Sequence, residues 1–177
     1  PKFVSDAAIP GRAACLGPAW QTASGEWASL AGIPSSQIED VTVADLIGAG
    51  NAAEARIRWS ICSEARSPVC AVTQTVHLEN GRVRVAVTLQ GVYQQVGYEV
   101  PCLVTDGRGT AETTTTPTSL VVRHDGWEFV VQIGQAAACV LDEVPRANRF
   151  GVYRIARFSV PGEAFDVELS LLPIPPS

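Results

Sequence analysis

The stretch that decides the fold is VTQTVHLENGRVRVAVTL, which covers residues 72–89. Apolar and polar side chains alternate on both sides of Asn80-Gly81. Asn and Gly are the residues that best tolerate the two positive φ angles of a type I′ turn, and this turn has the twist that flanking strands need. The stretch therefore predicts a β-hairpin with one apolar face.

The two-residue turn also predicts the register of this hairpin. The expected cross-strand pairs are Glu79 with Arg82, Leu78 with Val83, Val76 with Val85, and Val72 with Leu89. A slip of one residue would turn the valines toward water, so we expect this register and no other.

Two further hairpins are expected downstream. Asp125-Gly126 predicts a turn that pairs His124 with Trp127, Val122 with Phe129, and Leu120 with Val131. Residues 152–160 and 165–172 also alternate, and the loop between them predicts the pairs Val160 with Phe165, Phe158 with Val167, and Ala156 with Leu169.

Turn residues recur along the chain at intervals of about 8–12 residues, with no convincing long helix, which indicates about ten strands. This pattern is typical of an all-β fold, an antiparallel β-sandwich of jelly-roll or meander type. Residues 1–40 hold Pro1, Pro10, Pro18 and Pro34 and show no sustained period, so we expect an irregular N-terminal arm. Residues 41–177 are expected to form the β-sandwich domain.

The bulk composition excludes some classes of function. Thirteen basic and eighteen acidic residues give a net charge of −5, which argues against nucleic acid as a partner. No apolar run approaches the roughly 18 residues of a membrane span, and no signal peptide is visible. The chain begins with Pro1 and contains no Met, so we expect a processed chain or a piece of a longer protein.

Cys62 and Cys70 are the pair of cysteines close enough in sequence to suggest a disulfide. So short a ring would stabilise the fold by only ~2.5 kcal/mol. One objection is that matching Ile57, Trp59 and Ile61 to Val76, Gln74 and Val72 places the two thiols on opposite faces of the sheet. Both alternatives stay open here, and a bridge would imply an exported protein, extracellular or periplasmic.

Three tryptophans are candidates for ligand binding. Trp20 and Trp27 lie in the N-terminal arm, and Trp127 follows the Asp125-Gly126 turn. Exposed tryptophans serve as platforms for sugar rings, because the indole is apolar and carries one polar atom. The alternative is that Trp20 and Trp27 pin the arm to the sheet.

Arg146 and Arg149 are the other candidates for ligand binding. They flank Asn148 in a segment expected to connect strands, and connecting loops are where sandwiches carry their binding residues. A pair of guanidinium groups suits a carboxylate, for instance that of a uronic acid. The alternative is two surface arginines in a chain with one lysine.

The sequence offers little for catalysis. His77 shares a strand face with Glu79, but no second histidine or Cys-x-x-Cys is near enough in sequence to complete a metal site. His124 stands beside Asp125, and a histidine oriented by a carboxylate is one half of a catalytic dyad, although Asp125 is better explained as a turn former. No nucleophile elbow, phosphate loop or dinucleotide fingerprint is present. We therefore expect no catalytic residue, metal or cofactor in this chain.

Asn148-Arg149-Phe150-Gly151-Val152-Tyr153, followed by the expected closing hairpin, resembles the C-terminal β-sandwich of bacterial polysaccharide-degrading enzymes. Residues 98–106, a strand that runs into Asp-Gly, fit the same resemblance, which covers residues 41–172. In heparinase II/III-like lyases and related glycosidases this sandwich follows an α-helical toroid that carries most catalytic groups. The resemblance implies a non-catalytic accessory module that packs on a catalytic domain and binds glycan.

Two functional hypotheses follow. The first is an accessory or binding module of an exported carbohydrate-directed protein, with a glycan and an adjoining catalytic domain as partners. The second is a structural or assembly subunit, of a coat or surface, whose N-terminal arm contacts a neighbour in a homo-oligomer. A free-standing enzyme would require a pocket with converging titratable groups.

Overall fold

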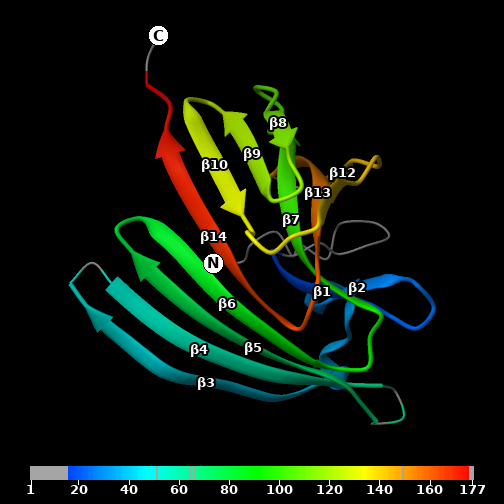
Figure 1. Ribbon diagram of the computed structural model, residues 1–177. Helices are drawn as coiled ribbons and strands as arrows, with labels where there is room; N and C mark the ends of the chain where they lie inside the picture. Colours follow the sequence, from blue (N-terminus) through cyan, green and yellow to red (C-terminus); the bar gives the residue numbers. More distant parts are fainter. Residues whose placement is uncertain (1–15, 51, 64, 66, 149, 176–177) are drawn as a thin grey trace.

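The structure is a computed structural model, and it describes residues 16–175 apart from positions 51, 64, 66 and 149. This part of the chain folds into two antiparallel β-sheets, with two short 3-10 turns at Leu30–Gly32 and Ser35–Gln37 (Figure 1). The expected all-β antiparallel sandwich is confirmed. Fourteen strands are described, more than the predicted number of about ten, because strands of three to five residues show too few alternations to be recognised.

The larger sheet has eight strands. In spatial order they are β3 (Ile38–Ala49), β4 (Ala52–Cys62), β5 (Pro68–Glu79), β6 (Arg82–Gly91), β14 (Ala164–Pro173), β10 (Trp127–Gln132), β9 (Ser119–His124) and β8 (Glu112–Thr115). In Figure 1 the long strand β14 runs between the β3–β6 group and the β8–β10 group.

The smaller sheet has six strands. In spatial order they are β11 (Ala138–Leu141), β13 (Gly151–Val160), β7 (Gln95–Thr105), β1 (Gly17–Gln21) and β2 (Trp27–Ser29), and β12 (Arg146–Asn148) pairs with the start of β13. Pro101 is tolerated in the central strand β7 because the described part of β1 ends opposite Glu99, which leaves that side of Pro101 without a ladder partner from β1.

Both two-residue turns form as predicted. Asn80 and Gly81 have φ angles of 50° and 77°, and Asp125 and Gly126 have φ angles of 47° and 75°. The cross-strand pairs of both hairpins are the predicted ones, from Glu79 with Arg82 to Val72 with Leu89, and from His124 with Trp127 to Leu120 with Val131.

The predicted closing hairpin is wrong. β13 pairs with β7 and β11, whereas β14 pairs with β6 and β10 in the other sheet, so the loop after Val160 carries the chain across the sandwich. The apolar faces of the two strands do meet, but across the core and not side by side in one ladder. Alternation shows which face is apolar, and both arrangements satisfy it.

The expectation of an irregular arm over residues 1–40 is wrong for residues 17–29. β1 pairs with β7 and β2 pairs with β1, so this segment belongs to the smaller sheet. Its strands are short and contain Gly17 and Pro18, which hides the alternation. Residues 1–15 lie outside the described part of the chain.

The disulfide alternative is also wrong, because Cys62 and Cys70 are both free thiols. β4 and β5 pair two residues away from the expected register, with Ile61 opposite Cys70 and Cys62 opposite Pro68. Adjacent residues of a strand point to opposite faces, so the Cys62 side chain is directed away from that of Cys70. The Cys62 thiol instead donates a hydrogen bond to Glu39 Oε2 at 3.3 Å, and burial raises the pKa of Cys70 to about 12.

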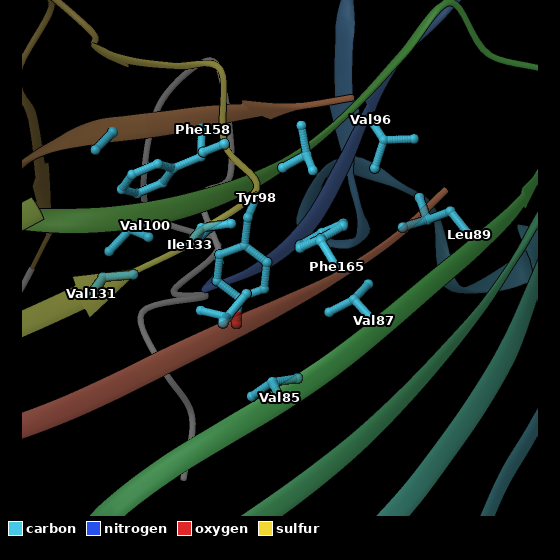
Figure 2. Close-up of a cluster of buried hydrophobic side chains, with 14 of the residues drawn as sticks. Val85, Val87, Leu89, Val96, Tyr98, Val100, Val131, Ile133, Phe158 and Phe165 are labelled. Carbon is cyan, nitrogen blue, oxygen red and sulfur yellow. The ribbon is translucent and has the colours of Figure 1, made fainter. Parts of the chain in front are cut away.

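The core lies between the two sheets. β6 contributes Val85, Val87 and Leu89, and β7 contributes Val96, Tyr98 and Val100, all of them buried (Figure 2). The rings of Tyr98 and Phe165 pack edge to face, with centroids 6.2 Å apart and planes at 85°. Burying one large apolar side chain stabilises a fold by roughly 1.5–3 kcal/mol, so this cluster holds the sheets together.

Candidate functional site: a cleft between the sheets

A cleft of about 340 Å³ lies between the two sheets, beyond the packed core. The smaller sheet contributes Leu103 from β7 and Tyr153 from β13, which are opposite each other in the ladder. The larger sheet contributes Val122, Phe129 and Leu171 from β9, β10 and β14. The walls are therefore mostly apolar, as is usual for pockets that bind small organic groups.

Trp127 stands at the rim of this cleft, with 49% of its surface exposed. It is the first residue of β10, and it pairs with His124 across the Asp125-Gly126 turn. Its place beside the turn, at the end of the hairpin, accounts for the exposure. An exposed indole beside a cleft can stack on an apolar ring face.

His124 brings a polar group to the same rim. Its Nε2 lies 3.3 Å from Asp106 Oδ2, in the turn that follows β7. The other oxygen, Oδ1, accepts hydrogen bonds from the backbone N–H groups of Arg108 and Gly109, both at 2.8 Å. These two bonds, followed by that from His124, lower the pKa of Asp106 to about 2. The carboxylate is therefore charged at neutral pH and orients the imidazole.

The Asp106 turn also packs closely against His124. A Cβ placed on Gly109 would lie 3.0 Å from His124 Cε1, so a larger residue at this position would press on the imidazole. The side chain of His124 is only 20% exposed. The ring is thus held by a carboxylate and by the backbone of a turn, in one orientation.

Tyr153 adds a hydroxyl group to the cleft. Burial raises its pKa, and the negative charge of Asp106 raises it further. The hydroxyl therefore stays protonated in the neutral range and remains a hydrogen-bond donor.

The cleft thus combines apolar walls, an exposed indole, an oriented imidazole and a protonated phenol. Among the residues that the structure describes, no group of three or more His, Cys, Asp or Glu side chains is placed to hold a metal ion. The arrangement can hold a small ring that has an apolar face and polar edges.

The structure separates the predicted ligand-binding residues from one another. Trp127 lies at the cleft, in the larger sheet, whereas Trp20 and Trp27 belong to β1 and β2 of the smaller sheet. The prediction for Trp20 is wrong, because the residue is 1% exposed and packs in the core. A fully buried indole has no free face for a sugar.

Trp27 is half-buried over a buried ion pair. Arg157 Cζ lies 4.9 Å from the centroid of the Trp27 ring, and Arg157 Nη2 donates a hydrogen bond to Glu99 Oε1 at 2.7 Å. Glu99 is 1% exposed, so the ion pair with Arg157 is largely shielded from water. This geometry gives Trp27 a structural contact with the sheet. It is in line with the alternative that the arm tryptophans pin the arm to the sheet.

Arg146 lies at the start of β12, not in a connecting loop, and it pairs with Asp142 in the segment before this strand. Its Nη2 donates a hydrogen bond to Asp142 Oδ2 at 2.7 Å, and its side chain is only 15% exposed. Arg149, the second member of the predicted pair of guanidinium groups, lies outside the described residues.

Sequence reasoning missed Asp106 and Tyr153. The sequence pattern marks Asp106 only as the end of a strand that runs into Asp-Gly, and it offers His124 only its neighbour Asp125, which is better explained as a turn former. Asp125 has a φ angle of 47° and forms the turn, while Asp106 arrives from the end of a strand in the other sheet. No local pattern signals a contact between two sheets.

No protein-family model matches the sequence, and no curated protein is significantly similar to it. A solved structure described as that of HI1317 aligns with a TM-score of 0.41 and 10% sequence identity, over 77% of this chain and 64% of that chain. No helix in the described part of the chain is long and apolar enough to cross a membrane. The chemistry of the cleft is therefore inferred from its own residues.

Proposed function

We propose that this chain is a non-catalytic accessory β-sandwich module of an exported carbohydrate-directed protein, and that it binds a sugar ring in the cleft at Trp127. The observation that carries the proposal is the exposed indole beside an oriented imidazole and a protonated phenol. A pyranose ring has an apolar C–H face and a rim of hydroxyl groups. The indole suits the face, and His124 and Tyr153 suit the rim.

The accessory role is supported by the side chains that line the cleft, because the described ones do not form a set of catalytic groups. His124 and Asp106 form an oriented pair, but the described lining includes no Ser, Cys or Lys, and its one carboxylate, Asp125, forms the turn before β10. Most glycoside hydrolases need two carboxylates that face each other across the sugar. Catalysis would then belong to an adjoining domain, as the resemblance to polysaccharide-degrading enzymes implies. Export remains part of the proposal and no longer rests on a disulfide.

The test is retention by polysaccharides in native affinity gels. Trp127→Ala should weaken retention about fivefold or more, since stacking of a ring on an aromatic side chain contributes on the order of 1–3 kcal/mol. Phe150→Ala is the matched control, because Phe150 is an aromatic residue that is 53% exposed and lies outside the cleft. Equal retention of the wild-type chain and Trp127→Ala on every polysaccharide that retains the chain would exclude this cleft as the glycan site.

An assembly subunit is the second candidate, and one observation favours it. Val41 and Val43 are 61% and 64% exposed on β3, the edge strand of the larger sheet. Among the described residues no strand pairs with the outer side of β3, and an edge with exposed valines is a surface on which another strand can add. Val43→Arg should then reduce the oligomer size in sedimentation experiments, and a wild-type chain that sediments as a monomer would exclude this candidate.

A further inference from the structure

A row of polar side chains crosses the outward face of the larger sheet. The register places one residue from each of six adjacent strands in this row: Ser119, Gln132, Glu168, Arg84, His77 and Glu54. We call this row the polar track. Glu168 alternates along β14 with the buried residues Val167 and Leu169, so the track faces away from the core.

The surface is hollowed along the track. One hollow of about 970 Å³ is lined by Ser119, Gln132, Glu168 and Arg84, and another of about 330 Å³ is lined by Arg84 and His77. Arg84 lines both, so the two hollows adjoin at this residue, and Glu54 lies beyond them at the end of the track. Adjacent strands are spaced about 4.8 Å apart, so a row across six strands is about 24 Å long. A ligand that fills it is a chain that runs across the strands.

The side walls of the larger hollow are held in place by hydrogen bonds. Thr116 and Ser119 share a hydroxyl–hydroxyl contact of 2.7 Å in the turn before β9. Gln135, in the turn after β10, accepts a hydrogen bond at its Oε1 from the backbone N–H of Asp166 at 3.4 Å. Both turns border the same hollow, which gives it a shape that does not depend on the ligand.

Glu168, the carboxylate near the middle of the track, is balanced by two arginines. Glu168 lies 3.8 Å from Arg84 and 3.5 Å from Arg82, and His77 lies 3.4 Å from Glu54. Asp166 adds a further carboxylate to the larger hollow and would repel an anionic chain. The amide of Gln132 and the hydroxyl of Ser119 can both donate and accept hydrogen bonds. This combination suits a ligand with many hydroxyl groups and no charge.

We propose that the polar track binds a linear, uncharged polysaccharide that lies across the strands. This site is independent of the cleft at Trp127, because Gln132 and Val131 point to opposite faces of β10 and the cleft opens between the sheets. The polar track therefore does not rest on the proposed function of the cleft, and the two sites can be tested separately.

The first experiment measures retardation in native gels that contain hydroxyethyl-cellulose, galactomannan or polygalacturonate. The wild-type chain should be retarded by an uncharged polymer and not by the anionic polygalacturonate. Gln132→Ala should weaken that retardation about three- to tenfold, the loss expected from one or two hydrogen bonds. Gln90→Ala is the matched control, since Gln90 is exposed on β6 but lies outside both hollows. Thermal unfolding of each variant establishes that the fold is intact.

A series of uncharged oligosaccharides, from disaccharide to hexasaccharide, separates the two sites. Binding to the polar track should strengthen with every added sugar, whereas binding in the cleft should stop improving at a short length. Trp127→Ala should leave the length-dependent component unchanged. The polar track is excluded if no uncharged polymer retards the chain, if polygalacturonate alone does so, or if Gln132→Ala binds as the wild-type chain does.

Discussion

Tyr98 and Trp127 are both aromatic residues on strands of the sandwich, and their surroundings are opposite. Tyr98 is 2% exposed in the middle of β7, with β1 and β13 as neighbouring strands and Phe165 against its ring. Trp127 is 49% exposed at the first position of β10, where the hairpin ends. Position along a strand thus decides whether an aromatic side chain closes the space between the sheets or borders an opening. The packed region and the cleft should respond differently to mutation.

The largest effect is expected in the packed region. Tyr98→Ala removes a buried ring and leaves a cavity between the sheets, so the free energy of unfolding should fall by about 3–5 kcal/mol. Denaturant unfolding followed by tryptophan fluorescence measures this loss. A loss below about 1 kcal/mol would show that the sheets close over the cavity. The packed region and the cleft would then not differ in how well they tolerate truncation of an aromatic side chain.

A milder change in the same region sharpens the comparison. Phe165→Leu keeps an apolar side chain on β14 but loses the edge-to-face contact with Tyr98. The free energy of unfolding should therefore fall by about 1–2 kcal/mol. In a double-mutant cycle, Phe165→Leu should lower the free energy of unfolding by less in a Tyr98→Leu background than in the wild-type chain. Additive losses would mean that the two rings do not stabilise each other.

The cleft should tolerate truncation. Trp127 is already half exposed at the rim of the cleft, so in Trp127→Ala the free energy of unfolding should change by less than about 1 kcal/mol. The same denaturant experiment measures it beside Tyr98→Ala. A loss comparable to that of Tyr98→Ala would assign Trp127 a structural role and would remove the basis of the sugar platform.

The smallest effect concerns the Asp106 carboxylate. Its pKa of about 2 in the folded chain lies below the ordinary value of about 3.9, so the charged form stabilises the fold above about pH 4. This contribution should be lost as the pH falls through about 2. The thermal midpoint of Asp106→Asn should therefore lie slightly below that of the wild-type chain at pH 7, and the two should converge near pH 2. A difference that persists unchanged at pH 2 would mean that charge at Asp106 is not its cause.

The hairpins could be predicted from sequence because their information is local. Asn80-Gly81 and Asp125-Gly126 determine both the turn and the register, and the observed ladders follow them. The crossing between β13 and β14 could not be predicted in the same way. Each strand shows an apolar face, but nothing within the two strands says whether those faces lie in one ladder or on opposite sides of a core.

The candidate site was predictable only in part. Trp127 follows a legible turn, so its place at the end of a hairpin was foreseeable. Asp106 reaches His124 from the turn after β7, and Tyr153 lines the same cleft from β13, which makes the cleft a product of tertiary packing. Trp20 was predicted to bind a ligand but is buried on β1. Its polar neighbours in the sequence do not reveal this burial.

The crossing after Val160 has a consequence for the order of synthesis. β14 is the strand that joins β6 to β10, and it is made after both. Until it emerges from the ribosome, the β3–β6 meander and the β8–β10 group each present an unpaired edge at β6 and at β10. Pairing over so long a sequence separation is slow, and open edges in the waiting chain favour aggregation. We therefore expect the nascent chain to depend on chaperones until its last strand has been added.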